Sequence, residues 1–294
     1  MRVPATSGNV GPGFDCFGVA LTLYNHFQFI PADQVRITAS GLGSANLDVS
    51  VHNLVYRSWL KCWQMLNQNP PPVHLHIDMH IPLSRGLGSS ATAICAGITA
   101  ANVWAGQPLS QGQLISLATD LEGHPDNVTP ALVGGAQLIV DRVVCPIPWH
   151  ENLAVVVAIP DFELSTTKAR QVLPEMVSRE SAIFNTAHLA LLTQALATGN
   201  PDWLRTALQD RLHQPYRTPL IPAMTDILQG AMAQGAYGVV ISGAGPSLLA
   251  ITPPDRASAV GSVMTHIWRS RDIQSTYLVL AIDTQGTVVT QVNP

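Results

Sequence analysis

Between residues 74 and 81, in the sequence HLHIDMHI, polar and apolar side chains alternate at every position. A period of two places all the apolar side chains on one face of a β-strand and all the polar ones on the other. The run therefore predicts a half-buried strand that ends at Pro82. The apolar face consists of Leu75, Ile77, Met79 and Ile81, and the polar face of His74, His76, Asp78 and His80.

Helical signals follow this strand. Residues 91–104 are rich in small apolar side chains and are closed by Gly106 and Pro108, which predicts a helix. A second helix is predicted after Ser110, because serine is a favoured N-cap and apolar residues then recur at helical spacing. These apolar residues are Leu114, Leu117, Ala118 and Leu121.

The second half of the chain carries shorter signals of both kinds. Its strands are predicted at residues 153–159, 238–242, 248–252 and 277–282, and its helices at 181–198, 202–209 and 257–269. Strands and helices intermingle while long β–α–β repeats are few, which favours an α+β fold over a doubly wound sheet. No clear linker marks a domain boundary, and the best candidate is the segment CPIPWHEN at Cys145–Asn152. We therefore expect one domain at residues 1–150 and a second at 151–294.

Length and composition narrow the class of protein. A chain of 294 residues, 47% of them hydrophobic, can build the core of one large or two ordinary domains. The formal net charge is −4 and only 15 Lys and Arg are spread along the chain, which argues against a nucleic-acid partner. Four scattered cysteines without a CxxC pair, at positions 16, 62, 95 and 145, fit reduced thiols in a cytoplasmic protein.

Two long stretches without charge, Gly86–Thr119 and Ile227–Pro254, raise the question of a membrane span. Both are interrupted by Gly, Pro and polar residues, so we expect tightly packed soluble elements and no membrane partner. The first residues, MRVPATSGNVGPGFD, lack the apolar core of a secretory signal. The sequence therefore predicts a cytoplasmic protein.

The turn between the predicted strand and helix has the sequence PLSRGLGSSA. Gly86 and Gly88 can adopt positive φ and let a ligand approach the backbone, while the helix start offers free N–H groups and a positive dipole end. Arg85 points either toward a phosphate or toward solvent. The turn predicts a polyphosphate site, but the lysine of GxxxxGK[ST] is absent and a plain tight turn explains these residues equally well. The predicted site comprises Pro82, Leu83, Ser84, Arg85, Gly86, Leu87, Gly88, Ser89, Ser90 and Ala91.

Three motifs resemble those of the GHMP kinases, the family of galactokinase, homoserine kinase and mevalonate kinase. PATSGNVGPGFDCFGVAL at Pro4–Leu21 is similar to the first motif, PLSRGLGSSA to the second, and SGAGPS at Ser242–Ser247 to the third. The resemblance implies that the loop holds the phosphates of ATP, with Mg²⁺ and without a Walker lysine. It also implies a homodimer and a two-domain fold, in which an N-terminal domain like domain 2 of ribosomal protein S5 precedes a ferredoxin-like domain. The chain departs from the family in starting only a few residues before the first motif, where a longer first strand is usual.

Within the family, the resemblance is closest to the homoserine kinases. The segments EGHPDNVTPALVGG at 122–135, LSTTKAR at 164–170 and DRLHQPYR at 210–217 are similar to that branch. The resemblance implies ATP-dependent phosphorylation of the side-chain hydroxyl of L-homoserine in threonine biosynthesis. This substrate carries an ammonium, a carboxylate and a hydroxyl, so its site needs an anion, a cation and a hydrogen-bonding group.

The resemblance implies roles for five residues around the charged end of the substrate. Asn9 and Asp15 would hold the amino end, with Asp15 as the partner of the ammonium. Arg170 and Arg217 would grip the carboxylate through their planar guanidinium forks, beside Thr166.

The resemblance also implies roles for residues at the reacting end. Asn127 would orient the hydroxyl and take part in catalysis together with Arg170. Glu122 and one of Ser89 or Ser90 would complete a sparse Mg²⁺ shell. Asp126 is a candidate base, although phosphoryl transfer depends mainly on positioning and on positive charge around the transferring group.

Three other functions fit parts of the sequence. HLHIDMH is similar to the HxHxDH signature of binuclear zinc hydrolases, but its last spacing is one residue too long and its alternation spreads the polar side chains along a strand. A relative that binds ligand without catalysis is disfavoured because Glu122, Asn127 and both substrate arginines are present. A GHMP kinase for mevalonate or a sugar is disfavoured by Asp15, since those substrates have no ammonium to pair with it.

Overall fold

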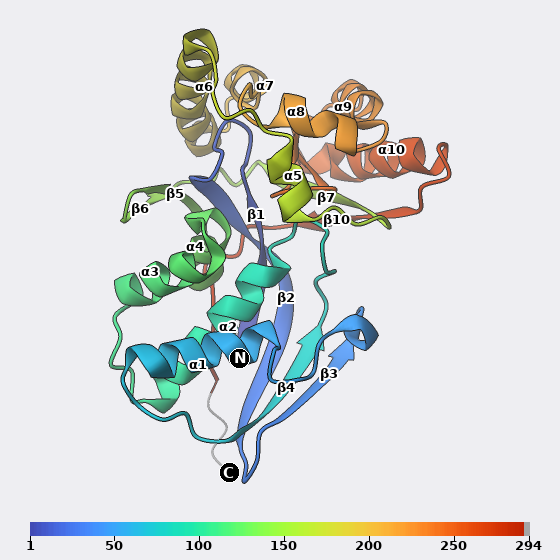
Figure 1. The fold of residues 1–294 in the computed structure, drawn as a ribbon. Coiled ribbons are helices and arrows are strands. Elements are labelled where there is room, and N and C mark those ends of the chain that lie inside the picture. Colours follow the sequence, from blue (N-terminus) through green and yellow to red (C-terminus); the bar gives the residue numbers. More distant parts are fainter. Residues whose placement is uncertain (291–294) are drawn as a thin grey trace.

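The computed structural model describes residues 1–290, which form two β-sheets with helices packed against them (Figure 1). The first sheet has the strand order β3–β4–β2–β5–β6, with β1 also paired to β2. Its pairs are antiparallel except for β3 with β4, which are parallel. The strands are β1 (Arg2–Gly8), β2 (Phe17–Pro31), β3 (Arg36–Gly41), β4 (Val73–Met79), β5 (Ala136–Val140) and β6 (Val143–Ile147).

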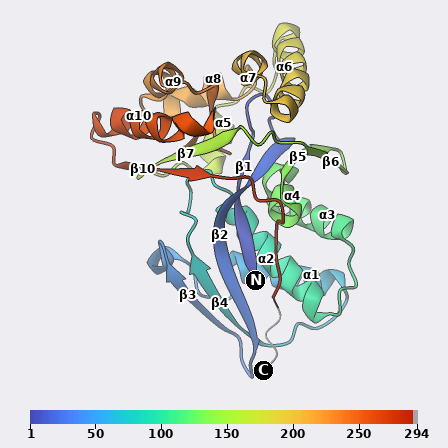
Figure 2. The same ribbon diagram turned by 180° about the vertical axis from the view of Figure 1, so that it is seen from behind.

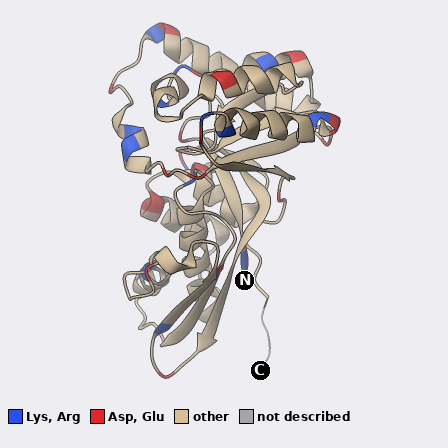
Figure 3. Cartoon of the chain, turned by 90° about the vertical axis from the view of Figure 1, so that its right-hand side faces the viewer, with Lys and Arg blue, Asp and Glu red and all other residues tan. Residues whose placement is uncertain are grey.

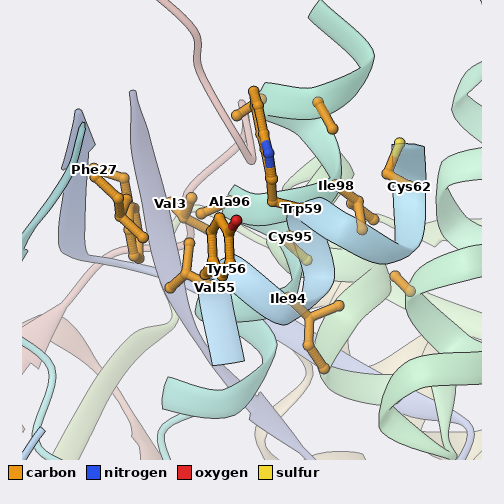
Figure 4. Packing of buried hydrophobic residues seen from close by; sticks show 14 of the residues in the cluster. Val3, Phe27, Val55, Tyr56, Trp59, Cys62, Ile94, Cys95, Ala96 and Ile98 are labelled. Carbon is orange, nitrogen blue, oxygen red and sulfur yellow. The ribbon is translucent and has the colours of Figure 1, made fainter. Parts of the chain in front are cut away.

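Four helices cover one face of the first sheet (Figure 1): α1 (Leu54–Met65), α2 (Ser89–Trp104), α3 (Gln111–Glu122) and α4 (Pro125–Val133). The core between helices and sheet is built around aromatic residues of α1, and Figure 4 shows Tyr56 and Trp59 among the aliphatic side chains of α2. The small residues of α2 let it approach α1 closely. A Cβ at Gly97 would lie 2.3 Å from the carbonyl oxygen of Val55, so only glycine fits there.

Helix α3 and most of strand β4 confirm the local predictions made from the sequence, but β4 ends at Met79, so His80 and Ile81 lie outside the strand that was predicted to reach Pro82. Along β4 the apolar side chains are buried and the polar ones are partly exposed, position by position. Helix α3 begins with a capping box, in which Ser110 and Gln113 bond each other's backbone, and ends at Gly123 with φ of 92°. Helix α2 begins at Ser89, two residues before the predicted start, because Gly88 in the left-handed region serves as its N-cap.

The second sheet has four antiparallel strands in the order β10–β7–β9–β8. Helices α9 and α10 pack against it and enclose a separate apolar core around Trp268. The strands are β7 (Ala154–Pro160), β8 (Gly238–Ile241), β9 (Leu248–Thr252) and β10 (Ser275–Leu280). The helices are α5 (Thr166–Gln171), α6 (Arg179–Thr198), α7 (Pro201–Ala207), α8 (Gln214–Arg217), α9 (Met224–Ala233) and α10 (Ala257–Arg269). The mixture is the α+β fold that the sequence predicted.

The two sheets share a third apolar core, which joins Phe17 of the first sheet and Leu87 of the loop before α2 to Val155 and Leu249 of the second sheet. The predicted boundary at residue 150 falls between β6 and β7, which belong to different sheets. After β10 the chain returns along the first sheet, where Val288 bridges to Arg2 (Figure 2). Because of this return and the shared core, the two units pack as one molecule around the cavity described below.

Charged residues of both signs are spread over both units, and Figure 3 shows several of them on the helices of the second unit. Among residues 1–290, no helix combines the length and the apolar character that crossing a membrane requires.

Candidate functional site

A cavity of about 440 Å³ lies where the two units meet. Its wall includes Asn9 of the first motif, residues 83–90 of the loop and Gly243–Gly245 of the third motif. These three parts of the wall are more than 70 residues apart in sequence, and the fold brings them to one place. Other wall residues that the sequence singled out are Glu122, Asn127, Thr166, Arg170 and Arg217.

The loop before α2 is shaped by contacts with the other two motifs. Gly86 has φ of 73°, and a Cβ there would lie 2.2 Å from the carbonyl oxygen of Ser242. Gly88 has φ of 67°, and a Cβ there would lie 2.0 Å from Oγ1 of Thr6. The hydroxyl of Ser242 also donates to the carbonyl of Gly86 over 2.7 Å. Both glycines are thus needed for close packing between motifs, whereas the first N–H groups of α2 stay free to face a ligand.

Exchanging Gly86 for alanine (G86A) is expected to lower the free energy of unfolding by roughly 2–5 kcal/mol, the sum of a left-handed backbone penalty and an overpacking penalty. The matched control is G43A, because Gly43 has φ of 71° but nothing within 4 Å of the position that a Cβ would take. The control carries only the backbone penalty, about 1–2 kcal/mol. Chemical denaturation of both variants measures the difference, and equal losses would contradict the close approach to Ser242.

Arg85, from the same loop, is bonded to the second unit. Its guanidinium donates to the carbonyls of Pro160 at 3.0 Å and Asp161 at 2.6 Å, and lies 3.3 Å from the carboxylate of Glu163. It also donates to the carbonyl of Leu83. These contacts make Arg85 a tether between the loop and the segment after β7.

Ser90 and Glu122 meet on the cavity wall. The hydroxyl of Ser90, in the first turn of α2, donates to Oε2 of Glu122, at the end of α3, over 2.6 Å. Burial raises the pKa of Glu122 above its usual value, although the bond from Ser90 acts in the opposite direction. Within residues 1–290, no Lys, Arg or His lies in salt-bridge range of this carboxylate. Ser89 also lines the cavity beside this pair.

The start of α4 forms a buried polar cluster. Asp126 is fully buried, and its Oδ1 lies 2.9 Å from Nδ1 of His124 and 3.3 Å from Nδ2 of Asn127. The side-chain oxygen of Asn127 accepts from the hydroxyl of Thr6 and from the N–H of Gly8, both near 3 Å. These bonds fix Asn127 with its amide group at the cavity wall. The second oxygen of Asp126 has no hydrogen-bond partner in the described part of the chain.

His124 is a wall residue that the sequence analysis missed. Burial lowers its pKa, but the hydrogen bond and the charge of Asp126 outweigh burial and raise the pKa overall. Atoms of His124, Asp126 and Asp15 lie within 4.8 Å of one another. The available signal was the HPDN sequence, which places His124 two positions before the candidate base.

Asp15 and Arg170 are bonded to each other across 155 residues of sequence. The two guanidinium nitrogens meet the two carboxylate oxygens at 3.0 and 2.5 Å, and about one third of each side chain is exposed. Asn9 holds the loop that carries Asp15, since its Oδ1 accepts from the N–H of Asp15 and its Nδ2 donates to the carbonyl of Gly243. Asn9 therefore uses its amide within the protein.

Arg217 is 1% exposed, yet it reaches the cavity wall. It donates to the carbonyls of Ala169 and Gly243 at 3.0 and 3.1 Å, and among residues 1–290 no carboxylate lies within salt-bridge distance of it. Burial and the nearby Arg170 lower the pKa of Arg217 to about 10. A buried cation without an acidic partner is costly, so this position favours an anionic ligand.

One end of the cavity carried no signal in the sequence. Leu47, His52, Leu54 and Val55, around the start of α1, line that end. The segment before α1 has no motif, and its side chains reach the loop only through the packing of α1 on α2. Thr166, at the opposite end, is exposed at the first turn of α5.

The histidines of β4 do not form a metal cluster. His74 and His76 lie 3.0 and 2.9 Å from the hydroxyl of Thr38, and Ser40 joins His76 to Asp78. Among the residues described, the group found close enough to hold a metal is Asp15, His124 and Asp126. The polar side chains of β4 bond Thr38 and Ser40 of the neighbouring strand β3 and do not form such a group of three.

Two family models match this chain, the GHMP kinases N terminal domain over residues 53–135 and the GHMP kinases C terminal over residues 192–269. The chain is 51% identical over 292 residues to a homoserine kinase of Trichormus variabilis, with 97% of each chain covered. It is 52% identical over 298 residues to a homoserine kinase of Synechococcus sp., which covers 99% of this chain and 97% of the relative.

Solved structures agree with these relatives. The homoserine kinase from Cytophaga hutchinsonii is 29% identical and has a TM-score of 0.87, with 97% of this chain and 95% of that one covered. A mevalonate kinase with 12% identity and a TM-score of 0.72 covers 97% of this chain and 99% of its own, and shares the fold. The two-domain arrangement that the motifs predicted is confirmed.

Proposed function

The chain belongs to the homoserine kinases of the GHMP kinase family, and we propose that its cavity binds ATP and L-homoserine side by side. The reaction is phosphorylation of the side-chain hydroxyl of L-homoserine, which gives O-phospho-L-homoserine for threonine biosynthesis.

The observation that carries the substrate assignment is the pair of arginines at one end of the cavity. Arg217 is buried without an acidic partner in residues 1–290, and Arg170 lies nearby with its charge shared with Asp15. Two guanidinium forks suit a carboxylate, and Asp15 suits an ammonium. Mevalonate and sugars offer no ammonium, so the charges favour an α-amino acid.

The phosphates of ATP are assigned to the loop and the start of α2. Backbone N–H groups there have no helical partner, and the helix dipole favours an anion. The hydroxyls of Ser89 and Ser90 and the apolar end around Leu54 and Val55 complete a site for phosphates and a base. Arg85 takes part through its tether to the second unit, which holds the loop in place.

Ser90 and Glu122 fit a hard cation. A hydroxyl and a carboxylate oxygen 2.6 Å apart match the oxygen ligands that Mg²⁺ prefers, and Glu122 is a half-buried carboxylate without a basic partner in the described chain. When bound, Mg²⁺ neutralises charge on the phosphates during the transfer. Ser89 lines the same part of the wall, so either serine hydroxyl is in reach of the phosphates.

The residues at the start of α4 orient the acceptor. Asn127 is fixed by Thr6 and Gly8, so its amide is in place to bond the substrate hydroxyl. Asp126 is fully buried and bonds both His124 and Asn127, which favours a positioning role for this carboxylate over direct contact with the hydroxyl. Thr166 lies at the arginine end of the wall, where its hydroxyl can bond the substrate carboxylate.

Purified protein supplied with MgATP is expected to release ADP in the presence of L-homoserine, and not with mevalonate, galactose or no acceptor. A coupled assay for ADP measures this directly. Turnover with mevalonate or galactose would move the assignment to another GHMP substrate. Binding of ATP without turnover of any acceptor would support the nucleotide site but contradict the assignment of L-homoserine as the substrate. The cytoplasmic location and the homodimer stay predictions. Light scattering tests the second, because it measures the mass of the particle in solution.

A further inference from the structure

Arg85 holds the backbone of the second unit with two bonds from one edge of its guanidinium. Its Nε donates to the carbonyl of Pro160 over 3.0 Å, and its Nη2 donates to the next carbonyl, that of Asp161, over 2.6 Å. Its Nη1 donates to the carbonyl of Leu83 in its own loop over 3.1 Å and lies 3.3 Å from the carboxylate of Glu163. The side chain is only 14% exposed. The guanidinium is therefore engaged by backbone on both sides of the boundary between the two units.

The segment held in this way leads to the end of the cavity that is assigned to the substrate. Residues 161–165 connect β7 to α5, the helix that carries Thr166 and Arg170. The same segment makes a second contact with the loop, because the N–H of Leu164 donates to the carbonyl of Ser84 over 3.4 Å. Leu164 is also buried and lines the cavity. The loop and the start of α5 are thus joined within a few residues of the groups assigned to the substrate.

The conformation of the loop depends on these contacts. Ser84, which comes directly before Arg85, has φ of 53°, a left-handed value that residues with a Cβ seldom adopt. Such a residue keeps this conformation only while its surroundings hold it, and here bonds to the second unit do so. A ligand that fixes the loop therefore also favours the observed position of residues 161–165, and a ligand that fixes the start of α5 favours the observed position of the loop.

We propose that Arg85 is a positioning residue that couples the binding of ATP to the binding of L-homoserine. It acts through the carbonyls of Pro160 and Asp161 and not by contact with a phosphate. The proposal rests on the proposed function, because the loop is assigned there to ATP and the start of α5 to the substrate. Whichever ligand binds first bears the entropy of ordering the contact, so the second binds tighter, and linkage makes the effect equal in both directions.

Calorimetry measures this coupling as the ratio of two dissociation constants for L-homoserine, one without nucleotide and one with Mg²⁺ and a non-hydrolysable ATP analogue. The wild-type ratio is expected to lie at roughly 5 to 150, the usual size of a coupling between two sites. Exchanging Arg85 for methionine (R85M) is expected to bring the ratio to about 1. A general loss of structure would weaken binding in both states and leave the ratio unchanged. An unchanged ratio in R85M, or a wild-type ratio of about 1, would therefore overturn the proposal.

Two further variants separate the bonds to the carbonyls from the charge of Arg85. Exchanging Arg85 for lysine (R85K) keeps the charge but removes the planar fork that bonds two carbonyls at once, so this variant is expected to lose most of the coupling. Exchanging Glu163 for glutamine (E163Q) removes an exposed ion pair, which contributes little, and should keep the wild-type ratio. Full coupling in R85K, or its loss in E163Q, would contradict an action through the carbonyls.

Hydrogen–deuterium exchange gives a second measurement that needs no substrate. The peptide covering residues 161–171 is expected to exchange more slowly when the ATP analogue alone binds to the wild type, and to show no such slowing in R85M. No slowing in the wild type at saturating analogue, or equal slowing in R85M, would overturn the coupling. Failure of the proposed function is recognised separately, since wild-type protein would then release no ADP with L-homoserine.

Discussion

Exchanging Arg217 for lysine (R217K) is expected to raise the KM for L-homoserine roughly 10- to 100-fold, the value of one to two charged hydrogen bonds, with little change in the KM for ATP. The guanidinium of Arg217 is held by the carbonyls of Ala169 and Gly243, which orient it toward the cavity. A lysine has no planar fork and cannot keep both bonds while it contacts a carboxylate. Steady-state kinetics with each substrate varied in turn measures the two KM values.

The same variant is expected to become sensitive to pH. Burial already lowers the pKa of Arg217 to about 10. A lysine has a lower intrinsic pKa, and burial favours its neutral form, so it loses its charge at a lower pH than arginine does. The KM for L-homoserine of R217K is therefore expected to climb as pH rises, while that of the wild type stays flat over the same range.

The control for R217K is R211K. Arg211 lies in the same DRLHQPYR segment, but it is exposed, pairs with Glu180 and does not line the cavity. Its exchange is expected to leave both KM values unchanged. Equal rises of the two KM values in R217K would indicate a general disturbance of the cavity and would contradict a role in holding the carboxylate.

Exchanging Glu122 for glutamine (E122Q) is expected to lower kcat roughly 10²- to 10³-fold, the cost of removing one well-placed electrostatic group from such a site. The bond to Ser90 can be kept by the amide oxygen, so the structure around α2 and α3 should persist. Titration of Mg²⁺ in the kinase assay should show a higher half-saturating concentration in E122Q. The control is E175Q, because Glu175 is exposed, lies outside the cavity wall and forms no salt bridge with the described residues.

Because the pKa of Glu122 is raised, acid pH is expected to lower the activity of the protein but to favour its stability. Protonation at acid pH removes the anion that would hold Mg²⁺, so wild-type kcat/KM is expected to fall on the acid side, and E122Q should lack this limb. In the ligand-free protein, the half-buried carboxyl of Glu122, whose pKa is raised, binds its proton more tightly in the folded than in the unfolded state. Its contribution to the free energy of unfolding is therefore largest at acid pH and is lost as pH rises through the raised pKa.

E122Q removes this unfavourable charge, so the ligand-free variant is expected to be more stable than the wild type near neutral pH. Thermal unfolding without nucleotide and metal measures this difference. A variant that is both less active and less stable at neutral pH would show that Glu122 holds the fold rather than a cation.

Some features of the site were determined by the sequence alone. Alternation in HLHIDM determined most of β4, although the alternating His80 and Ile81 lie beyond its end at Met79. Ser110 and Gln113 set the start of α3 through bonds between residues three apart. The order of three motifs indicated the family, and the comparisons confirmed it. The strand and the helix start follow from neighbouring residues, and the family follows from the order of motifs along the chain, so none of them depends on how distant segments pack.

Other features depended on contacts between distant residues. The sequence assigned Gly86 and Gly88 to a ligand, which stays a prediction because both line the cavity; it did not show that their Cβ positions are closed by Ser242 and Thr6. It assigned Asn9 to the substrate, which stays a prediction: Asn9 lines the cavity, and the structure adds that its amide bonds the backbone of Asp15 and of Gly243. A sequence motif records which residue types are present, and it does not record which neighbour uses their bonds.

The sequence by itself determined the family of this protein and predicted the groups of its site: a Gly/Ser turn before a helix, a carboxylate at each end, and two arginines for an anion. Only the tertiary structure decided how these groups are set. It closed Asp15 onto Arg170, buried Arg217 without an acidic partner in residues 1–290, and placed Phe14 beneath both arginines. The reason is physical, because charge and burial depend on distances between groups more than 150 residues apart, and those distances exist only once the two units pack together.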